Sequence, residues 1–491
     1  MVKTRFAPSP TGYVHIGGLR TALYCYLFAR KNSGKFILRV EDTDQGRFVP
    51  GATENLLAVL DTFGLTPDEG PNADGGNGPY FQSQRLPIYQ KYLHELVEKG
   101  SAYYCFCSSE RLSALHDEQE ALKLPTGYDG CCRDLLLEES KKRVANGESY
   151  TIRLKVPKNE TIIFNDLIRG RLEFNTNEVE DQVLLKSDGF PTYHGAIVID
   201  DHLMGITHVM RGEEWISSIP KQVLTARALG MPLAEYAHMP NIMGSDGKKL
   251  SKRTGDTSVE SYLENGYLTE ALLNFIAFLG WNPKTTQEIF SMDELVAAFD
   301  IGGMGKSGPI LDPVKLDWMN AQYITRLSDD DLYARLENYL SKYDPEFYAN
   351  TFQKASKDLN LKIVHELKTR LKRLSEYKSL TTFMYGDAAV RSELLVNPKM
   401  KIEDLATAKI GLELAKKFLD GLTDQPDLET LKSLCLAKIA EAGMKNGQVL
   451  WPLRIALSGE EFSPGAFELV HILGLDVSRQ RVHTMLEKIS N

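Results

Sequence analysis

Residues 9–20 read SPTGYVHIGGLR, and this stretch decides how the N-terminal part of the chain folds. The residues before it favour a short strand, which Pro8 and Pro10 end because proline cannot donate to a sheet. After it, apolar residues return at the spacing of a helix that begins near Gly17. These residues are Ala22, Leu23, Tyr26, Leu27 and Ala29. The expected layout is therefore strand, tight loop and helix.

The start of that helix is a candidate phosphate site. A helix N-terminus presents unpaired N–H groups and the positive end of the helix dipole, and Gly17 and Gly18 would let an anion approach the backbone. His15 and Arg20 would flank the site with side-chain donors. A plain turn with a loop histidine also explains these residues, because short glycine motifs are weak evidence by themselves.

Length and composition describe a globular protein of several domains. The chain has 491 residues, of which 43% are apolar and 25% charged, and this favours several separate cores. Its longest apolar run, residues 271–280, is too short to span a bilayer. Six cysteines in so long a chain do not indicate a disulfide framework. We therefore expect a cytoplasmic protein with no membrane partner.

The charge distribution bears on a nucleic-acid partner. Net charge is −9, but residues 321–491 hold 24 basic and 24 acidic residues, so the acidic excess lies in the first 320 residues. Residues 362–378, with six basic and two acidic side chains, are expected to form one helix. Its buried stripe would be Val364, Leu367, Leu371 and Leu374. The basic face suits RNA, and a merely solvated face is the other interpretation.

The order of the expected elements predicts a multidomain chain with an α/β core. Strand and helix signals alternate over the first 85 residues, which predicts a parallel sheet with helices on its faces. Short alternating strands at 149–157 and 161–174 belong to an insertion, and residues 189–215 resume the pattern as two buried strands. The expected parts are a Rossmann-like domain (1–85 and 190–245), an α+β insertion (86–189), a region that opens with a basic loop (246–325) and an all-helical region (326–491).

Residues 244–256, GSDGKKLSKRTGD, form a second candidate phosphate site. Glycines stand near both ends, and four basic side chains fall within six positions. Such a loop can close over a polyphosphate and stabilise the charge that develops when pyrophosphate leaves. A solvated basic loop would explain this segment alone, whereas its pairing with the first stretch favours a nucleotide site.

Together these segments resemble a known family. PSPTGYVHIGG and KLSKR resemble the two signatures of class I aminoacyl-tRNA synthetases. Further motifs are similar to those of bacterial glutamyl-tRNA synthetases: RFAPSPTGYVHIGGLRTALY, FILRVEDTD, PTYH, HVMRGEEW and LWPLRIALSG. The resemblance runs from residue 3 to about residue 470. It implies that the insertion binds the acceptor end of tRNA, that residues 246–325 contact its stem and that the helical region binds its anticodon.

The resemblance implies a two-step reaction on ATP, L-glutamate and tRNA(Glu). Glutamate would attack the α-phosphate to form glutamyl-adenylate and pyrophosphate, and the terminal ribose of the tRNA would then take the glutamyl group. Mg²⁺ would accompany the ATP. Lys252, Lys249 and His15 would assist catalysis, and Glu213 would border the adenylate. The implied ATP site is His15, Gly17, Gly18, Glu214, Trp215, Lys249, Ser251 and Lys252.

Glutamate binding needs cations for two carboxylates and an anion for one ammonium group. Arg5 and Arg211 suit the carboxylates, because a guanidinium fork matches their geometry, and Glu41 suits the ammonium. The resemblance adds Ser9 and Tyr193 to this pocket. Ile197 is a departure, since some members carry asparagine there and could make one more hydrogen bond to substrate.

The insertion resembles a zinc knuckle that some members carry. Cys105, Cys107 and Cys132 are the candidate ligands, but Asp134 stands where a histidine could complete the set. The neighbouring Cys131 and Cys132 can supply only one comfortable tetrahedral ligand between them. We therefore expect reduced, buried thiols in place of a zinc ion.

The C-terminal region would read the anticodon. Arg454, Ser463 and Pro464 match the family's anticodon-contacting motif, and Arg370 is a further candidate. The resemblance implies a monomer and leaves open whether tRNA(Gln) is also charged. A small nucleotidyltransferase would not need this region, and a non-catalytic RNA-binding relative would not need KLSKR together with Arg5, Glu41 and Arg211.

Overall fold

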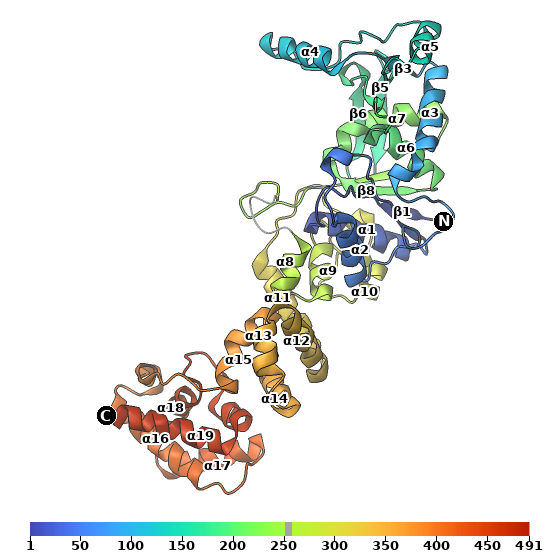
Figure 1. Ribbon diagram of the computed structural model, residues 1–491. Coiled ribbons are helices and arrows are strands. Elements are labelled where there is room, and N and C mark those ends of the chain that lie inside the picture. The colour runs from blue at the N-terminus through green and yellow to red at the C-terminus, as the bar shows by residue number, and fades with distance from the viewer. Residues whose placement is uncertain (251–257, 491) are drawn as a thin grey trace. The chain divides into compact units, whose positions relative to one another are not determined.

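The computed structural model describes residues 1–250 and 258–490. The chain divides into two compact units, which are described separately (Figure 1). The first is Met1–Ser261 with Thr269–Pro313, and the second is Tyr262–Leu268 with Val314–Asn491. Within the described ranges, no helix is both long enough and apolar enough to cross a membrane.

A four-stranded parallel sheet organises the first unit, as the alternating pattern predicted. Its strand order is β2-β1-β8-β9, and every pairing is parallel. The strands are β1 (Lys3–Phe6), β2 (Lys35–Leu38), β8 (His208–Gly212) and β9 (Glu235–Met239). In such a sheet, ligands bind beyond the carboxyl ends of the strands.

Helix α1 (Ile16–Lys31) confirms the predicted strand, loop and helix. It packs on β1, β2 and β8 and buries Leu19, Leu23 and Leu27 completely. Its other neighbours are α9 (Thr269–Ala277) and α10 (Met292–Ala298). The next helix of the alternating pattern predicted over the first 85 residues is α2 (Ala52–Thr62).

Between β2 and β8 the chain builds an antiparallel layer. The predicted short strands are present: β4 (Thr151–Leu154), β5 (Thr161–Asp166) and β6 (Gly170–Asn175). β4 pairs with β3 (Ala102–Cys105) and β7 (Val183–Leu185), while β5 and β6 form a separate hairpin. The helices here are α3 (Leu86–Glu98), α4 (Ser109–Ala121) and α5 (Leu137–Ala145). Buried residues of α3, β3, β4 and β7 share one apolar core.

The prediction of two strands within 189–215 was wrong for the first of them. Residues 193–203 form helix α6 (Tyr193–Leu203), and only β8 is a strand. Ala196, Ile197, Val198 and Ile199 are all at most 2% exposed, because α6 is covered by α3, β7 and α7 (Ile219–Leu229). A helix buried on every side shows the same apolar run as a buried strand, so periodicity could not separate them.

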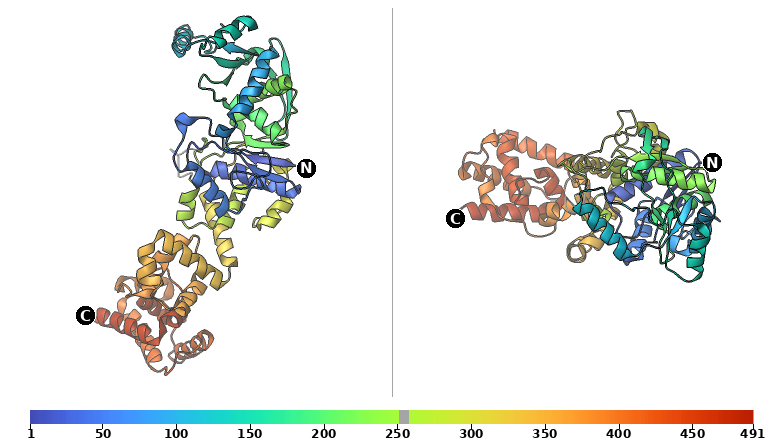
Figure 2. Two further views of the ribbon diagram at one scale, coloured as in Figure 1. Left: turned by 45° about the vertical axis from the view of Figure 1, so that its right-hand side comes forward. Right: turned by 90° about the horizontal axis from the view of Figure 1, so that it is seen from above.

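The secondary structure of the second unit is helical among its described residues, apart from an isolated β-bridge between Asn397 and Ile402, in agreement with the prediction (Figure 2, yellow to red). α8 (Val259–Glu264) and α11 (Pro313–Arg326) begin in the first unit and continue into the second. The helices that follow are α12 (Asp329–Tyr343), α13 (Pro345–Phe347), α14 (Lys357–Leu367), α15 (Tyr377–Tyr385), α16 (Leu405–Asp420), α17 (Leu428–Glu441), α18 (Asn446–Ser458) and α19 (Ala466–Ser490, kinked at Gly474).

Residues 362–378 do not form the single helix that was predicted. Helix α14 ends at Leu367, and a 3₁₀ turn at Leu374–Glu376 leads into α15. The four predicted stripe residues are nevertheless buried, at 5% exposure or less. The apolar spacing therefore identified the buried residues correctly, while the chain changes direction between them.

Candidate functional site

The candidate active site is a cavity of about 850 Å³ in the first unit, beyond the carboxyl ends of β1 and β8. Eleven residues that the sequence assigned to ATP or glutamate line it: Arg5, Ser9, His15, Gly17, Gly18, Glu41, Tyr193, Arg211, Glu214, Trp215 and Lys249. Ser251 and Lys252 lie outside the described residues. Segments more than 200 positions apart in sequence thus meet in one cavity.

The start of α1 differs from the prediction in one respect. His15 is the N-cap, and its Nδ1 accepts the N–H groups of Gly17 and Gly18 at 3.1 and 3.2 Å. These two donors are therefore paired, and an anion would reach them only after the ring moved. The exposed ring is itself placed at the cavity wall.

Arg20 is not the free phosphate donor that was predicted. Its Nη1 and Nη2 donate to the backbone carbonyls of Leu279 and Pro240, at 3.0 and 2.6 Å. The side chain is 4% exposed, although it touches the cavity. Arg20 therefore anchors α1 to the segments around residues 240 and 279.

Arg5 and Glu41 belong to a buried charge network. Asp201 Oδ1 accepts from Arg5 Nε at 3.2 Å and from Arg39 Nη1 at 2.8 Å, and Arg39 Nη2 donates to Glu41 Oε1 at 3.0 Å. Burial would raise the pKa of Asp201, but the charges of Arg5 and Arg39 lower it. Among the described residues, Arg5 has no acceptor besides Asp201, so both of its terminal NH₂ groups are left for a ligand.

Burial raises the pKa of Glu41, and Arg39 and Arg5 oppose this shift. A ligand ammonium group beside Glu41 would further stabilise its ionised form. Asp200 extends the same network, because its Oδ2 lies 3.7 Å from Arg39 Nε. It accepts from Arg85 Nε at 2.7 Å and from Tyr89 at 2.8 Å. No local sequence pattern pointed to Arg39, Asp200 or Asp201.

Arg211 has one N–H left for a ligand. A guanidinium has five N–H donors. Those of Arg211 reach four protein acceptors: His238 Nε2 at 2.9 Å, Tyr193 Oη at 2.6 Å, Gln222 Oε1 at 2.9 Å and the Trp215 carbonyl at 3.3 Å. In the described part of the chain, the remaining donor is on Nη1, beside Tyr193. Burial raises the pKa of Tyr193, so its hydroxyl keeps the proton that it can donate.

Of the three residues that follow β8, two line the cavity and one makes a structural contact elsewhere. Glu214 and Trp215 line the cavity, and Trp215 packs against Tyr193 at 4.2 Å between ring centroids. Glu213, which was expected to border the adenylate, does not line it. Its carboxylate accepts from Asn241 Nδ2 at 3.0 Å and from Arg169 Nη2 at 2.6 Å, so it joins the β5–β6 turn to the segment after β9.

The sequence analysis did not predict two cationic side chains that line the cavity, those of Arg47 and Lys186. Arg47 pairs with Asp44 at 2.6 Å, and Lys186 with Asp188 at 3.0 Å. Arg47, Asp44 and Lys186 all line the cavity. Arg47 follows the second strand by a few residues, which was the only available signal, and Lys186 lies in a distant segment that no motif marked. Ile197 is fully buried in α6 and is absent from the cavity lining.

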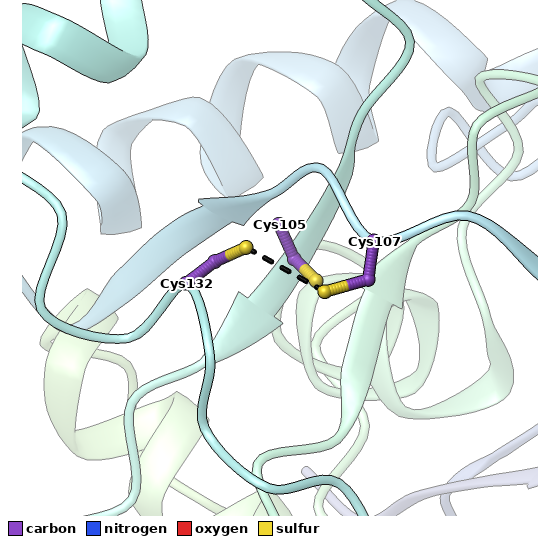
Figure 3. Close-up of side chains that lie close together, drawn as sticks. All are labelled: Cys105, Cys107 and Cys132. Atoms are coloured by element: carbon purple, nitrogen blue, oxygen red, sulfur yellow. Dashed lines mark hydrogen bonds between the residues drawn. The ribbon is translucent and has the colours of Figure 1, made fainter. Parts of the chain in front are cut away.

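Cys105, Cys107 and Cys132 converge, as Figure 3 shows. Their sulfur atoms lie within 4.8 Å of one another, and Cys107 and Cys132 are 3.7 Å apart. Asp134 does not join them, because its carboxylate is 87% exposed and pairs with Lys155 at 3.4 Å. The three thiols alone are one ligand short of the tetrahedral set of a structural zinc site.

The predicted anticodon residues gather in the second unit. Arg370 Nη1 donates to the Ser463 carbonyl at 3.0 Å, and Arg454 Nη2 donates to the Glu461 carbonyl at 2.7 Å. Ser463 and Pro464 are buried, and the backbone carbonyls of Ser463 and Glu461 hold Arg370 and Arg454 respectively. Two aromatic side chains that the sequence analysis missed stand beside them. Trp451 packs under Arg454, and Phe462 is 81% exposed.

Comparisons with known proteins cover nearly the whole chain. Residues 1–318 match the catalytic domain of class I tRNA synthetases (E and Q), and residues 331–486 match an anticodon binding domain. The glutamate–tRNA ligase of Clostridium novyi (strain NT) is 46% identical over 99% of this chain and 98% of its own, and that of Clostridium acetobutylicum is 44% identical over 99% of both. A crystal structure of a glutamate tRNA ligase from Elizabethkingia meningosepticum, in complex with its amino acid, has a TM-score of 0.88 at 36% identity and covers 99% of each chain.

Proposed function

The chain belongs to the family of class I tRNA synthetases for glutamate and glutamine, and we propose that it joins L-glutamate to tRNA(Glu) in two ATP-dependent steps. The resemblance found in the sequence is thereby confirmed at the level of the family. One observation carries the choice of amino acid: a single cavity brings together two arginines with donors to spare, Arg5 and Arg211, and the buried carboxylate of Glu41. These are the charges that complement the two carboxylates and the ammonium of glutamate.

Glutamate would bind through donors that the protein leaves unused. One of its carboxylates would accept from Arg211 Nη1 and the Tyr193 hydroxyl, which lie side by side. The other would accept from the terminal NH₂ groups of Arg5, while Asp201 holds the Nε end of that side chain. Glu41 would receive the ammonium group, with Ser9 at the same cavity wall.

ATP would lie along the start of α1 and the basic loop. His15 and Lys249 line the cavity, and Lys252 would stabilise the leaving pyrophosphate. A carboxylate oxygen of glutamate attacks the α-phosphorus, the bond to the β-phosphate oxygen breaks, and pyrophosphate leaves. A ribose hydroxyl of the tRNA then attacks the glutamyl carbonyl and releases AMP.

Magnesium bound to the ATP phosphates is part of the proposal. Mg²⁺ prefers oxygen ligands and keeps several waters. The cavity wall offers the carboxylates of Asp44 and Glu214 besides Glu41. These oxygens fit the metal, which would neutralise phosphate charge when bound.

The helical unit would select the tRNA through Arg454, with Arg370, Ser463 and Pro464 beside it. Two further expectations stay proposals: that the protein works as a monomer, and that it works in the cytoplasm. Use of tRNA(Gln) as a second substrate is the alternative within the same function.

The deciding experiment is glutamylation of purified tRNA(Glu) and tRNA(Gln) side by side, with glutamine as a competing amino acid. We expect glutamate to be joined to tRNA(Glu). Charging of both tRNAs would identify a non-discriminating enzyme, and charging of neither would refute the proposal and favour a non-catalytic tRNA-binding protein. Pyrophosphate exchange measured with and without tRNA tests a further expectation, that adenylate formation depends on tRNA.

A further inference from the structure

Arg211 contacts His238, which in turn contacts Asp166, and neither His238 nor Asp166 lines the cavity. His238 lies on β9 directly opposite Arg211 on β8, and its Nε2 accepts from Arg211 Nε at 2.9 Å. The other ring nitrogen, Nδ1, is 2.6 Å from Asp166 Oδ2. The side chains of His238 and Asp166 are both fully buried.

These contacts determine the tautomer of His238. Arg211 Nε can only donate, so Nε2 must present its lone pair and Nδ1 must carry the proton. That proton points at the Asp166 carboxylate, whose position fixes the ring. Burial lowers the pKa of His238, in keeping with a neutral ring.

Asp166 is itself held in place by backbone. It ends β5, and its Oδ1 accepts from the N–H groups of Ile168 and Arg169 at 2.9 and 2.8 Å. In the same turn, Arg169 Nε donates to the His238 carbonyl at 3.1 Å. The β5–β6 turn is thus bonded both to the ring and to the backbone of His238.

We propose that Asp166 and His238 are positioning residues that orient the Arg211 guanidinium toward glutamate. The inference rests on the proposed function, because it concerns how the amino acid is held. With Nε2 as a fixed acceptor behind the guanidinium, the free Nη1 donor stays beside the Tyr193 hydroxyl. Neither residue touches substrate, so both act through Arg211.

Asp166→Asn is the most informative variant. The asparagine oxygen is favoured at the Oδ1 position, where it accepts from the backbone N–H groups of Ile168, Arg169 and His238, and this puts its NH₂ group against His238 Nδ1. The ring then has to present N–H at Nε2, facing the N–H of Arg211. We expect the KM for glutamate to rise about tenfold to a hundredfold, with the KM for ATP nearly unchanged.

Two variants of His238 test the same point independently. His238→Leu removes the acceptor and should raise the glutamate KM as much as Asp166→Asn does. His238→Gln offers an amide oxygen to Arg211 and should stay within about threefold of wild type. Asp181→Asn is the matched control, because the Asp181 side chain is also buried, at 7% exposure, but accepts from Tyr103 and Arg133 instead.

The measurements are KM for glutamate and ATP, kcat, and the thermal unfolding temperature of each variant. A glutamate KM that stays at the wild-type value in folded Asp166→Asn, or that rises equally in the Asp181 control, would overturn the inference alone. If Asp166→Asn does not fold, equal glutamate KM values for His238→Leu and His238→Gln would overturn it. Wild-type protein that charges no tRNA would overturn the proposed function, and the inference with it.

Discussion

Replacing Arg454 by alanine tests whether α18 reads the tRNA. The guanidinium carbon lies 4.4 Å from the centroid of the Trp451 ring, and Nη2 donates to the Glu461 carbonyl. Arg454 Nε is buried and has no hydrogen-bond partner among the described residues. Burial lowers the pKa of Arg454, and the charge of nearby Arg370 adds to the shift. The protein therefore holds two arginines close together where an anionic or polar ligand would be favourable.

The expected loss follows from these contacts. Truncation removes one side chain that could stack on or hydrogen-bond to a base, which is worth about 1–3 kcal/mol. This corresponds to roughly a tenfold to hundredfold loss of kcat/KM for cognate tRNA. The bond to the Glu461 carbonyl adds about 1 kcal/mol to the free energy of unfolding, which the variant would also lose.

The assay is kcat/KM for tRNA(Glu) and tRNA(Gln), measured beside the KM for glutamate. The ratio between the two tRNAs should change, while the glutamate KM should not. Arg479→Ala is the control, because Arg479 also donates to backbone carbonyls, those of Leu419 and Leu422, and its loss should cost at least as much stability. Unchanged tRNA kinetics in the Arg454 variant, or a higher glutamate KM, would refute the prediction and show that Arg454 has a purely structural role.

Three further predictions concern the first unit. Gly17→Ala places a Cβ 3.1 Å from the His15 ring, and should raise the KM for ATP about twofold to tenfold. In Gly18→Ala the new Cβ meets only ordinary contacts, at 3.7 Å and beyond, so the KM for ATP should rise less. Equal increases in the two variants would contradict a role of the His15 ring in ATP binding. Lys252→Ala should fold normally by circular dichroism and lose about 100-fold in pyrophosphate exchange, and near-normal exchange would remove that lysine from the mechanism. Metal analysis should find well under one zinc per chain, because the three clustered thiols lack a fourth ligand; stoichiometric zinc released only by strong chelators would contradict this.

The sequence was most informative where local chemistry determines the backbone. Pro8 and Pro10 end the first strand and Gly17 follows the N-cap of α1, so strand, loop and helix could be predicted within a residue or two. It was least informative for α6, whose apolar residues are covered from all sides. The burial of α6 depends on its tertiary neighbours, and the spacing of apolar residues in the sequence carries no information about them.

The candidate site shows the same division. The sequence motifs predicted the residues that face the cavity, because phosphate and carboxylate groups require particular side chains. The motifs did not predict Asp201, which pairs with Arg5, or His238, which pairs with Arg211. Those pairings form only when β1, β8, β9 and α6 have come together in the fold. The N-cap hydrogen bond from the Gly17 N–H group to His15 Nδ1 likewise depends on a side-chain rotation that the spacing alone could not predict.

The order β2-β1-β8-β9 also constrains synthesis of the chain. β1 can pair with β2 early, but its other neighbour is β8, where Thr4 meets His208. A ribosome adding about 5–20 residues per second needs roughly 10–40 seconds to cover that interval. Throughout it, one edge of β1 has no strand beside it, and exposed edges invite pairing between chains. Nascent chains stalled before β8 should therefore be the species that aggregate and that depend most on chaperones.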